Sequence, residues 1–256
     1  MLPPYVPGTA PGDWQPTPPL FGPPLFRQFA TMVPFALTSP GQFLPPGPPP
    51  LASGRYRQDL AEVQALGSAS SSVRTADQAQ IAIFWQGDTP AAMWNRVADQ
   101  LAQAHDTTLT QNARLLAQLN IAMADATIGI WNAKNIYNFW RPVTAVRATS
   151  DPIWAPLLPT PPFQEYPSAH SGVSSAAASV LAATYGSNTS FSVTSAGLPG
   201  AERAFASFPS AVQQVEDARI YAGFHFRFSC IDGATLGVQV AQWVTQTLMQ
   251  PLPRRS

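Results

Sequence analysis

Proline is distributed unevenly along this chain, and this limits where helices can form. Residues 1–53 hold 16 of the 28 prolines in the 256-residue sequence. Proline lacks the backbone N–H that a helix interior needs, and its ring clashes with the preceding turn. We therefore expect residues 1–53 to form a non-helical N-terminal arm and residues 54–256 to form the domain proper.

The arm also carries aromatic side chains, which bear on whether it is ordered. A proline-rich segment can be disordered or can adopt extended polyproline structure. The aromatic residues favour an arm that packs along the domain surface, but the sequence leaves the disordered alternative open. The aromatic residues are Trp14, Phe21, Phe26, Phe29, Phe35 and Phe43.

Beyond the arm, apolar residues recur at helical spacing and predict an all-α fold, a single helical bundle. Thr75 followed by Gln78 resembles a capping box at a helix start. Residues 187–199 are expected to be loop with at most a short strand. Helices are expected near 55–66, 75–87, 90–105, 107–131, 168–185 and 201–224, and from Ser229 or Asp232 to about 249.

Composition excludes several classes of protein. The formal net charge is zero and charged residues make up 11% of the chain, so nucleic-acid binding has no electrostatic support. Cys230 is the sole cysteine, which rules out an intrachain disulfide and a cysteine-based metal site. No apolar run approaches the roughly 20 residues of a transmembrane helix. Residues 1–4 lack a signal-peptide pattern, so a secreted or periplasmic location would require a leader removed earlier.

The stretch Tyr166-Pro-Ser-Ala-His-Ser-Gly172 predicts the start of a tightly packed helix. Ser168 is a favoured N-cap residue. The first turn of a helix offers free N–H groups and a partial positive charge, which together bind anions. His170 would stand in that turn, where an imidazole can exchange protons with a bound oxyanion. The simpler interpretation is an ordinary capped helix with an incidental histidine.

Four further residues carry a second and a third motif. Lys134, the sole lysine, and Arg141 are seven residues apart, so on a continuous helix they would share one face. Arg219 and His225 flank Gly223, which can end a helix and turn the chain so that both side chains face one point. Each pair alone is also compatible with ordinary structural roles. Together with His170, however, they place cations and imidazoles in apolar surroundings, which predicts a bound multivalent oxyanion such as phosphate or vanadate.

The three motifs in order carry a specific resemblance. Lys134-x6-Arg141-Pro142, then Pro167-Ser168-x-His170, then Arg219-x5-His225 resembles the signature shared by vanadium-dependent haloperoxidases and type 2 phosphatidic-acid-phosphatase-like acid phosphatases. The resemblance covers about residues 134–232. It implies the helical-bundle fold of that superfamily.

The resemblance also implies a role for each matching residue. His225 would be the covalent ligand of vanadium, or the nucleophile that forms a phosphohistidine. His170 would be the general acid and base on the opposite side. The remaining contacts to the oxyanion would come from Lys134, Arg141, Arg219, Ser168 and the backbone N–H near Ala169.

The chain departs from the family pattern at a few positions. Ala169 stands where glycine is usual. Ser229 stands where an aspartate is usual, so support for His225 is expected from Ser229 or from Asp232. An upstream carboxylate usually orients the acid/base histidine. Asp88 is the favoured match for that carboxylate, and Asp125 and Glu165 are the alternatives.

The surroundings of the motifs favour the haloperoxidase branch. Phe163 and Trp140 resemble residues that line a halide pocket. We therefore expect an enzyme that uses hydrogen peroxide to oxidise halide to hypohalous acid, with vanadate as cofactor in a site that phosphate can also occupy. The alternatives are an acid phosphatase acting on phosphate esters through His225 and a non-catalytic phosphate- or vanadate-binding helical protein. Larger haloperoxidases contain two helical bundles, so a homodimer is a further expectation for a chain with room for about one.

Overall fold

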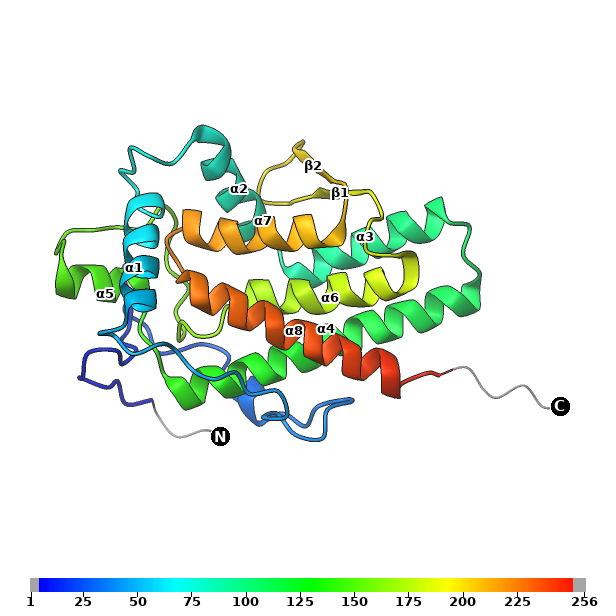
Figure 1. Ribbon diagram of the computed structural model, residues 1–256, viewed down its shortest axis with the longest axis horizontal. Helices are drawn as coiled ribbons and strands as arrows, with labels where there is room; N and C mark the ends of the chain where they lie inside the picture. The colour runs from blue at the N-terminus through cyan, green and yellow to red at the C-terminus, as the bar shows by residue number, and fades with distance from the viewer. Residues whose placement is uncertain (1–4, 251–256) are drawn as a thin grey trace.

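The computed structural model describes residues 5–250 and confirms the all-α prediction (Figure 1). Within these residues the β structure is one antiparallel pair of short strands, with Phe191 opposite Phe205. The elements are η1 (Arg27–Thr31), α1 (Gly54–Leu66), α2 (Ala76–Gln86), α3 (Pro90–Ala104), α4 (Leu109–Tyr137), α5 (Pro142–Thr149), α6 (Ala169–Tyr185), β1 (Phe191–Thr194), β2 (Glu202–Phe205), α7 (Phe208–Tyr221) and α8 (Arg227–Thr247).

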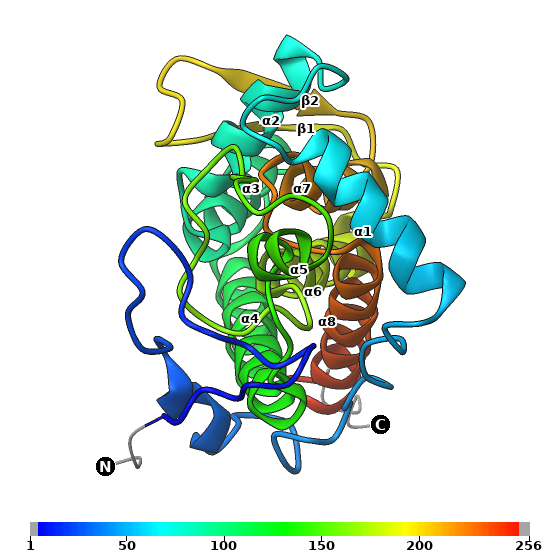
Figure 2. The same cartoon turned by 90° about the vertical axis from the view of Figure 1, so that its left-hand side faces the viewer.

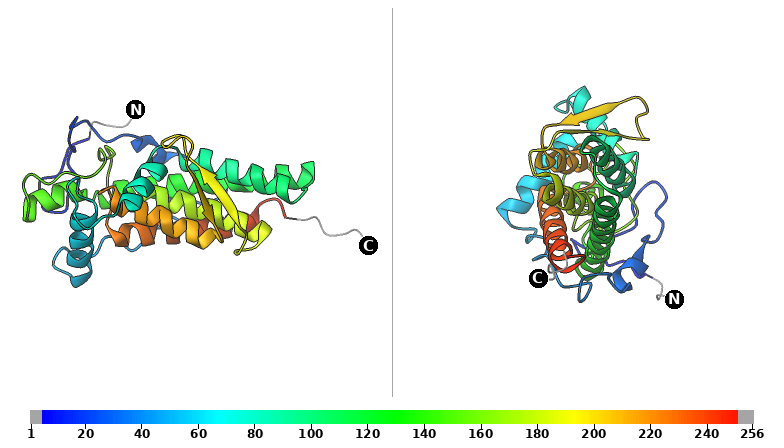
Figure 3. Two further views of the ribbon diagram at one scale, coloured as in Figure 1. Left: turned by 90° about the horizontal axis from the view of Figure 1, so that it is seen from above. Right: turned by 90° about the vertical axis from the view of Figure 1, so that its right-hand side faces the viewer.

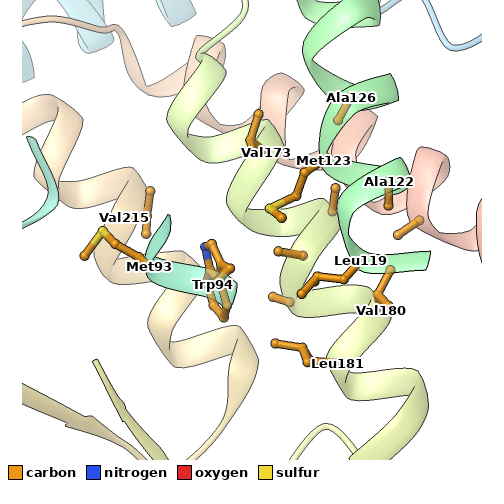
Figure 4. Close-up of a cluster of buried hydrophobic side chains, with 14 of the residues drawn as sticks. Met93, Trp94, Leu119, Ala122, Met123, Ala126, Val173, Val180, Leu181 and Val215 are labelled. Carbon is orange, nitrogen blue, oxygen red and sulfur yellow. The ribbon is translucent and has the colours of Figure 1, made fainter. Parts of the chain in front are cut away.

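Helix α6 lies at the centre of the bundle and packs on α4, α7 and α8 (Figures 1 and 3). Small residues let it approach its neighbours closely. A Cβ built on Gly237 of α8 would lie 2.0 Å from the carbonyl oxygen of Gly172 in α6. Leu119 and Met123 of α4 face Val180 and Val173 of α6 in the apolar core (Figure 4). This packing fixes α4, α6 and α8 relative to one another.

Three expected boundaries were wrong. The long helix α4 continues to Tyr137 rather than ending near residue 131, and α8 begins at Arg227 rather than at Ser229 or Asp232. Residues 202–205, expected to be helical, form β2 instead. Phe205 packs there against Trp85 and the Phe191 ring, and Ser207 then caps α7. Tertiary burial of the phenylalanine therefore overrides the local helical pattern.

Residues 5–53 lie along the bundle (Figure 2). The fully buried carboxylate of Asp125 in α4 accepts hydrogen bonds from the backbone N–H groups of residues 35, 36 and 37, at 2.7, 2.8 and 2.9 Å. Trp14 is fully buried, and its backbone N–H donates to the carbonyl oxygen of Asn138. The arm thus contacts both the middle and the end of α4. Within residues 5–250, no helix is both long enough and apolar enough to cross a bilayer.

Candidate active site

The three motifs meet at one end of the bundle. The last residues of α4 and α7 and the first residues of α6 and α8 lie at the same end (Figure 1). The sequence predicted that Lys134 and Arg141 would share one face of a continuous helix, and this was wrong. Helix α4 stops at Tyr137, and Asn138 turns the chain with φ of 46°. Arg141 is the residue that precedes the first turn of α5. The turn, not helical periodicity, therefore brings the two cations together.

Lys134 is fully buried at the end of α4. Its ammonium donates to the carbonyl oxygens of Gln164 and Glu165 at 2.7 and 2.8 Å. Burial lowers its pKa well below the usual value, and the charge of Arg141 lowers it further, whereas Glu165 acts in the opposite direction. The ammonium is therefore held in place by neutral carbonyl groups rather than by a paired carboxylate.

Arg141 is also fully buried and is held by three contacts. Its Nε donates to the carbonyl oxygen of Phe163 at 2.8 Å, and its Nη1 donates to that of Phe224 at 3.0 Å. Nη1 also lies 3.1 Å from Nε2 of His225. The Nη2 atom is buried without a hydrogen-bond partner. Burial lowers the pKa of Arg141 to about 10.

Arg219, in the last turn of α7, is the third fully buried cation. Its Nη2 donates to Oε1 of Gln86 at 2.7 Å, while its Nε and Nη1 are buried without partners. As predicted, Gly223 turns the chain after α7, with φ of 82°. The guanidinium then lies over the ring of Phe224, 4.9 Å from the ring centroid. Burial lowers the pKa of Arg219 to about 9.

His225 precedes α8 and is almost completely buried, at 2% exposure. Its Nδ1 lies 2.7 Å from Oε1 of Glu165 and 3.5 Å from the hydroxyl oxygen of Ser229. Burial lowers the pKa of His225 well below its usual value, and the charges of Arg141, Lys134, Arg219 and His170 lower it further. The other four titratable groups of the motifs therefore all act on His225.

The start of α6 provides the remaining predicted residues. Ser168 is the N-cap, as expected, and its side chain accepts from the N–H of Ser171 at 3.4 Å. The Ser171 hydroxyl donates to the same oxygen at 2.9 Å. His170 is half-buried in the first turn. Burial of its ring lowers its pKa well below the usual value, and Arg219, Arg141 and Lys134 lower it further, so the imidazole is neutral near pH 7.

The two residues predicted to line a halide pocket, Phe163 and Trp140, lie in different surroundings. Phe163 lies over both cations, with its ring centroid 4.9 Å from the Arg141 guanidinium and 5.4 Å from the Lys134 ammonium. Trp140 instead belongs to a buried aromatic cluster, where its indole N–H donates to the Tyr56 hydroxyl at 3.1 Å. The sequence placed both beside the halide, but the direction of the Trp140 ring depends on packing with α1.

The carboxylates considered for the two histidines have other partners. Asp88 forms an ion pair with Arg96 at 2.6 Å on the surface, so it is not available to His170. Asp125 holds the arm, and Asp232 accepts from the Tyr166 hydroxyl at 2.7 Å. The sequence missed the pairing of Glu165 with His225 because Glu165 precedes Ser168 in a loop whose path no helical pattern predicts. The signal that the sequence offered was that Glu165 lies three residues before Ser168, close to the predicted site.

The donor set fits a vanadate or phosphate ion. Three buried guanidinium nitrogens, Nη2 of Arg141 and Nε and Nη1 of Arg219, have no partner although buried donors are normally paired. In the part of the chain that the structure describes, no group of three or more His, Cys, Asp and Glu residues could hold a metal cation. The site therefore suits an oxyanion, whose oxygens would accept from these donors.

A helical bundle with buried cations at one end defines a class of oxyanion-binding protein, and comparison with known proteins identifies the family. The sequence matches the family described as "VCPO second helical-bundle domain" over residues 114–253, more than half of the chain. The chain therefore belongs to the vanadium-dependent haloperoxidase superfamily. It is 28% identical to the vanadium chloroperoxidase of Curvularia inaequalis over an alignment of 151 residues, which covers 46% of this chain and 25% of that protein.

Solved structures agree with this assignment. A bacterial vanadium-dependent iodoperoxidase is 31% identical and superimposes with a TM-score of 0.90, covering 100% of this chain and 65% of that one. A bacterial vanadium-dependent chloroperoxidase in its holo form, 16% identical, has the same fold with a TM-score of 0.75 over 94% of this chain and 64% of that one. The chain thus spans about a quarter of the length of its curated relative and less than two thirds of these structures.

Proposed function

We propose that this protein is a vanadate-dependent haloperoxidase that oxidises halide with hydrogen peroxide to hypohalous acid. The observation that carries the proposal is that Arg141 and Arg219 are fully buried and that three of their guanidinium nitrogens lack partners. Burying such charges is costly unless an anion compensates them. Similarity to a vanadium-dependent iodoperoxidase and a vanadium chloroperoxidase favours vanadate over phosphate as that anion.

Each residue of the site has a role in this proposal. Nε2 of His225 would be the ligand of vanadium. The donors to the vanadate oxygens would be Lys134, Arg141, Arg219, Ser168 and the backbone N–H at Ala169. Bound vanadate would supply the Lewis acid that activates hydrogen peroxide. His170, half-buried and neutral, can accept a proton from an incoming peroxide and return it to a departing oxygen.

Phe163 is the residue of the proposed halide pocket that the geometry supports. Its ring covers Arg141 and Lys134 and packs on Trp131 at 5.4 Å between centroids. An apolar wall beside cations excludes water and strengthens their attraction for a weakly hydrated anion. Phe163→Ala is accordingly expected to raise the KM for bromide more than it lowers kcat.

The test is halogenation of phenol red by the purified protein, with vanadate, hydrogen peroxide and bromide or iodide. We expect turnover that requires vanadate and is lost in His225→Ala. Phosphate release from 4-nitrophenyl phosphate without added vanadate, with no halogenation when vanadate is present, would replace the proposal by the phosphatase alternative. Tight vanadate binding without turnover in either assay would favour the alternative of a non-catalytic oxyanion-binding protein.

A further inference from the structure

The carboxylate of Glu165 makes the shortest contact to the ring of His225. Oε1 of Glu165 lies 2.7 Å from Nδ1, whereas the hydroxyl oxygen of Ser229 lies 3.5 Å away, at the limit of a hydrogen bond. Glu165 is fully buried and lies in the loop before α6, distant in sequence from His225. Asp232 is directed to Tyr166 instead.

The contacts on the two ring nitrogens fix the protonation of the imidazole. Nη1 of Arg141 lies 3.1 Å from Nε2. A guanidinium has only donors, so Nε2 must be the acceptor in that contact. A neutral imidazole then carries its proton on Nδ1, which donates to Oε1 of Glu165. Both contacts therefore favour the same tautomer, and the shorter one is that of Glu165.

Glu165 is itself held rigidly enough to impose this orientation. Its Oε1 also accepts from the backbone N–H of Phe226 at 3.1 Å, the residue that follows His225. Its carbonyl oxygen accepts from the Lys134 ammonium at 2.8 Å. One residue thus connects the lysine at the end of α4 with the histidine before α8. Its Oε2 is buried without a partner, close enough to Lys134 and Arg141 for their charges to act on it.

We propose that Glu165 is the positioning residue of His225. It accepts a hydrogen bond from Nδ1–H and so keeps Nε2 unprotonated, with a lone pair that can bind a ligand. The sequence pattern assigned this task to the position four residues after His225. Carboxylate partners of this kind orient metal-bound histidines and make them more basic. The consequence for vanadate rests on the proposed function, but the tautomer of His225 does not.

The first measurement is ¹⁵N NMR of histidine-labelled protein in vanadate-free buffer. The wild type is expected to show His225 protonated at Nδ1 only. Glu165→Gln keeps an acceptor oxygen and should preserve this tautomer, whereas Glu165→Ala should shift His225 towards a mixture of both. Ser229→Ala is the comparison variant. Because its contact with Nδ1 is at the limit of a hydrogen bond, it should shift the tautomer less than Glu165→Ala does. Identical His225 signals in wild type and Glu165→Ala would overturn the proposal.

The second measurement is vanadate affinity by equilibrium dialysis. Loss of such a partner typically costs about 10- to 100-fold, which we expect for Glu165→Ala but not for Ser229→Ala. Adding Ser229→Asp to Glu165→Ala places a carboxylate near Nδ1 again and should restore much of the loss. A Ser229→Ala effect as large as that of Glu165→Ala would contradict the assignment. A wild type that binds no vanadate would refute the proposed function, while the NMR result would still decide the role of Glu165.

Discussion

Replacing Arg219 by methionine tests whether its charge is uncompensated. The guanidinium is fully buried, and its pKa falls from 12.5 to about 9. At 1.36 kcal/mol for each pKa unit, the charged form costs the folded state about 5 kcal/mol near pH 7. The variant also loses a charged hydrogen bond to Gln86, about 2 kcal/mol, and the contact with Phe224, about 1 kcal/mol. The net expectation is stabilisation by about 2 kcal/mol.

The assay is urea unfolding in anion-free buffer and again with vanadate. Vanadate at 100 times its Kd should stabilise the wild type by about 2.7 kcal/mol, and Arg219→Met should lose most of that gain. The difference between the two proteins should therefore change sign when the anion is added.

Arg227→Met is the matched control. Its guanidinium lies 2.6 Å from both Glu62 and Asp217, and these partners raise the pKa of Arg227. This variant should lose stability equally with and without vanadate. If Arg219→Met lost as much stability as Arg227→Met in anion-free buffer, the idea of an uncompensated charge at Arg219 would be refuted.

Two further predictions concern stability. Burial raises the pKa of Glu216 from 4.5 to about 6, so its protonated form contributes stability below pH 4.5 that is lost as the pH rises through 6. In urea unfolding at pH 7.5, Glu216→Gln should therefore raise the free energy of unfolding by about 2 kcal/mol, and at pH 4 it should not change it. An equal increase at both pH values would contradict this cause. Gly237→Ala would press a methyl group against the Gly172 carbonyl in α6 and should cost about 3 kcal/mol in thermal unfolding. Gly54→Ala, where a Cβ meets nothing within 4 Å, should be neutral, and equal effects of the two alanines would contradict close packing of α6 on α8.

Local sequence signals predicted the elements that carry the site. Ser168 caps α6 and Gly223 turns the chain after α7, because capping and positive φ depend on a few adjacent residues. The ends of α4 and α8 were misplaced because helices extend where tertiary packing supports them. Residues 202–205 were expected to be helical because the burial of Phe205 is not visible in local periodicity.

Partners distant in sequence could not be predicted in the same way. The motifs identified cations and histidines, but the position of each carboxylate depended on loops and on the arm. Asp88 was the favoured match for the family's upstream carboxylate, yet it pairs with Arg96 at the surface. Asp125 holds residues 35–37 of the arm. Glu165 reaches His225 because the loop before α6 passes within hydrogen-bond distance of Nδ1, which only the three-dimensional path shows.

The buried cations are proposed to meet around a vanadate ion bonded to His225. A crystal structure of the protein soaked in vanadate tests this proposal most directly. We expect vanadium at bonding distance from Nε2 of His225, with its oxygens contacting Lys134, Arg141 and Arg219. Vanadate density elsewhere on the molecule, with these cations contacting no anion under saturating vanadate, would contradict it.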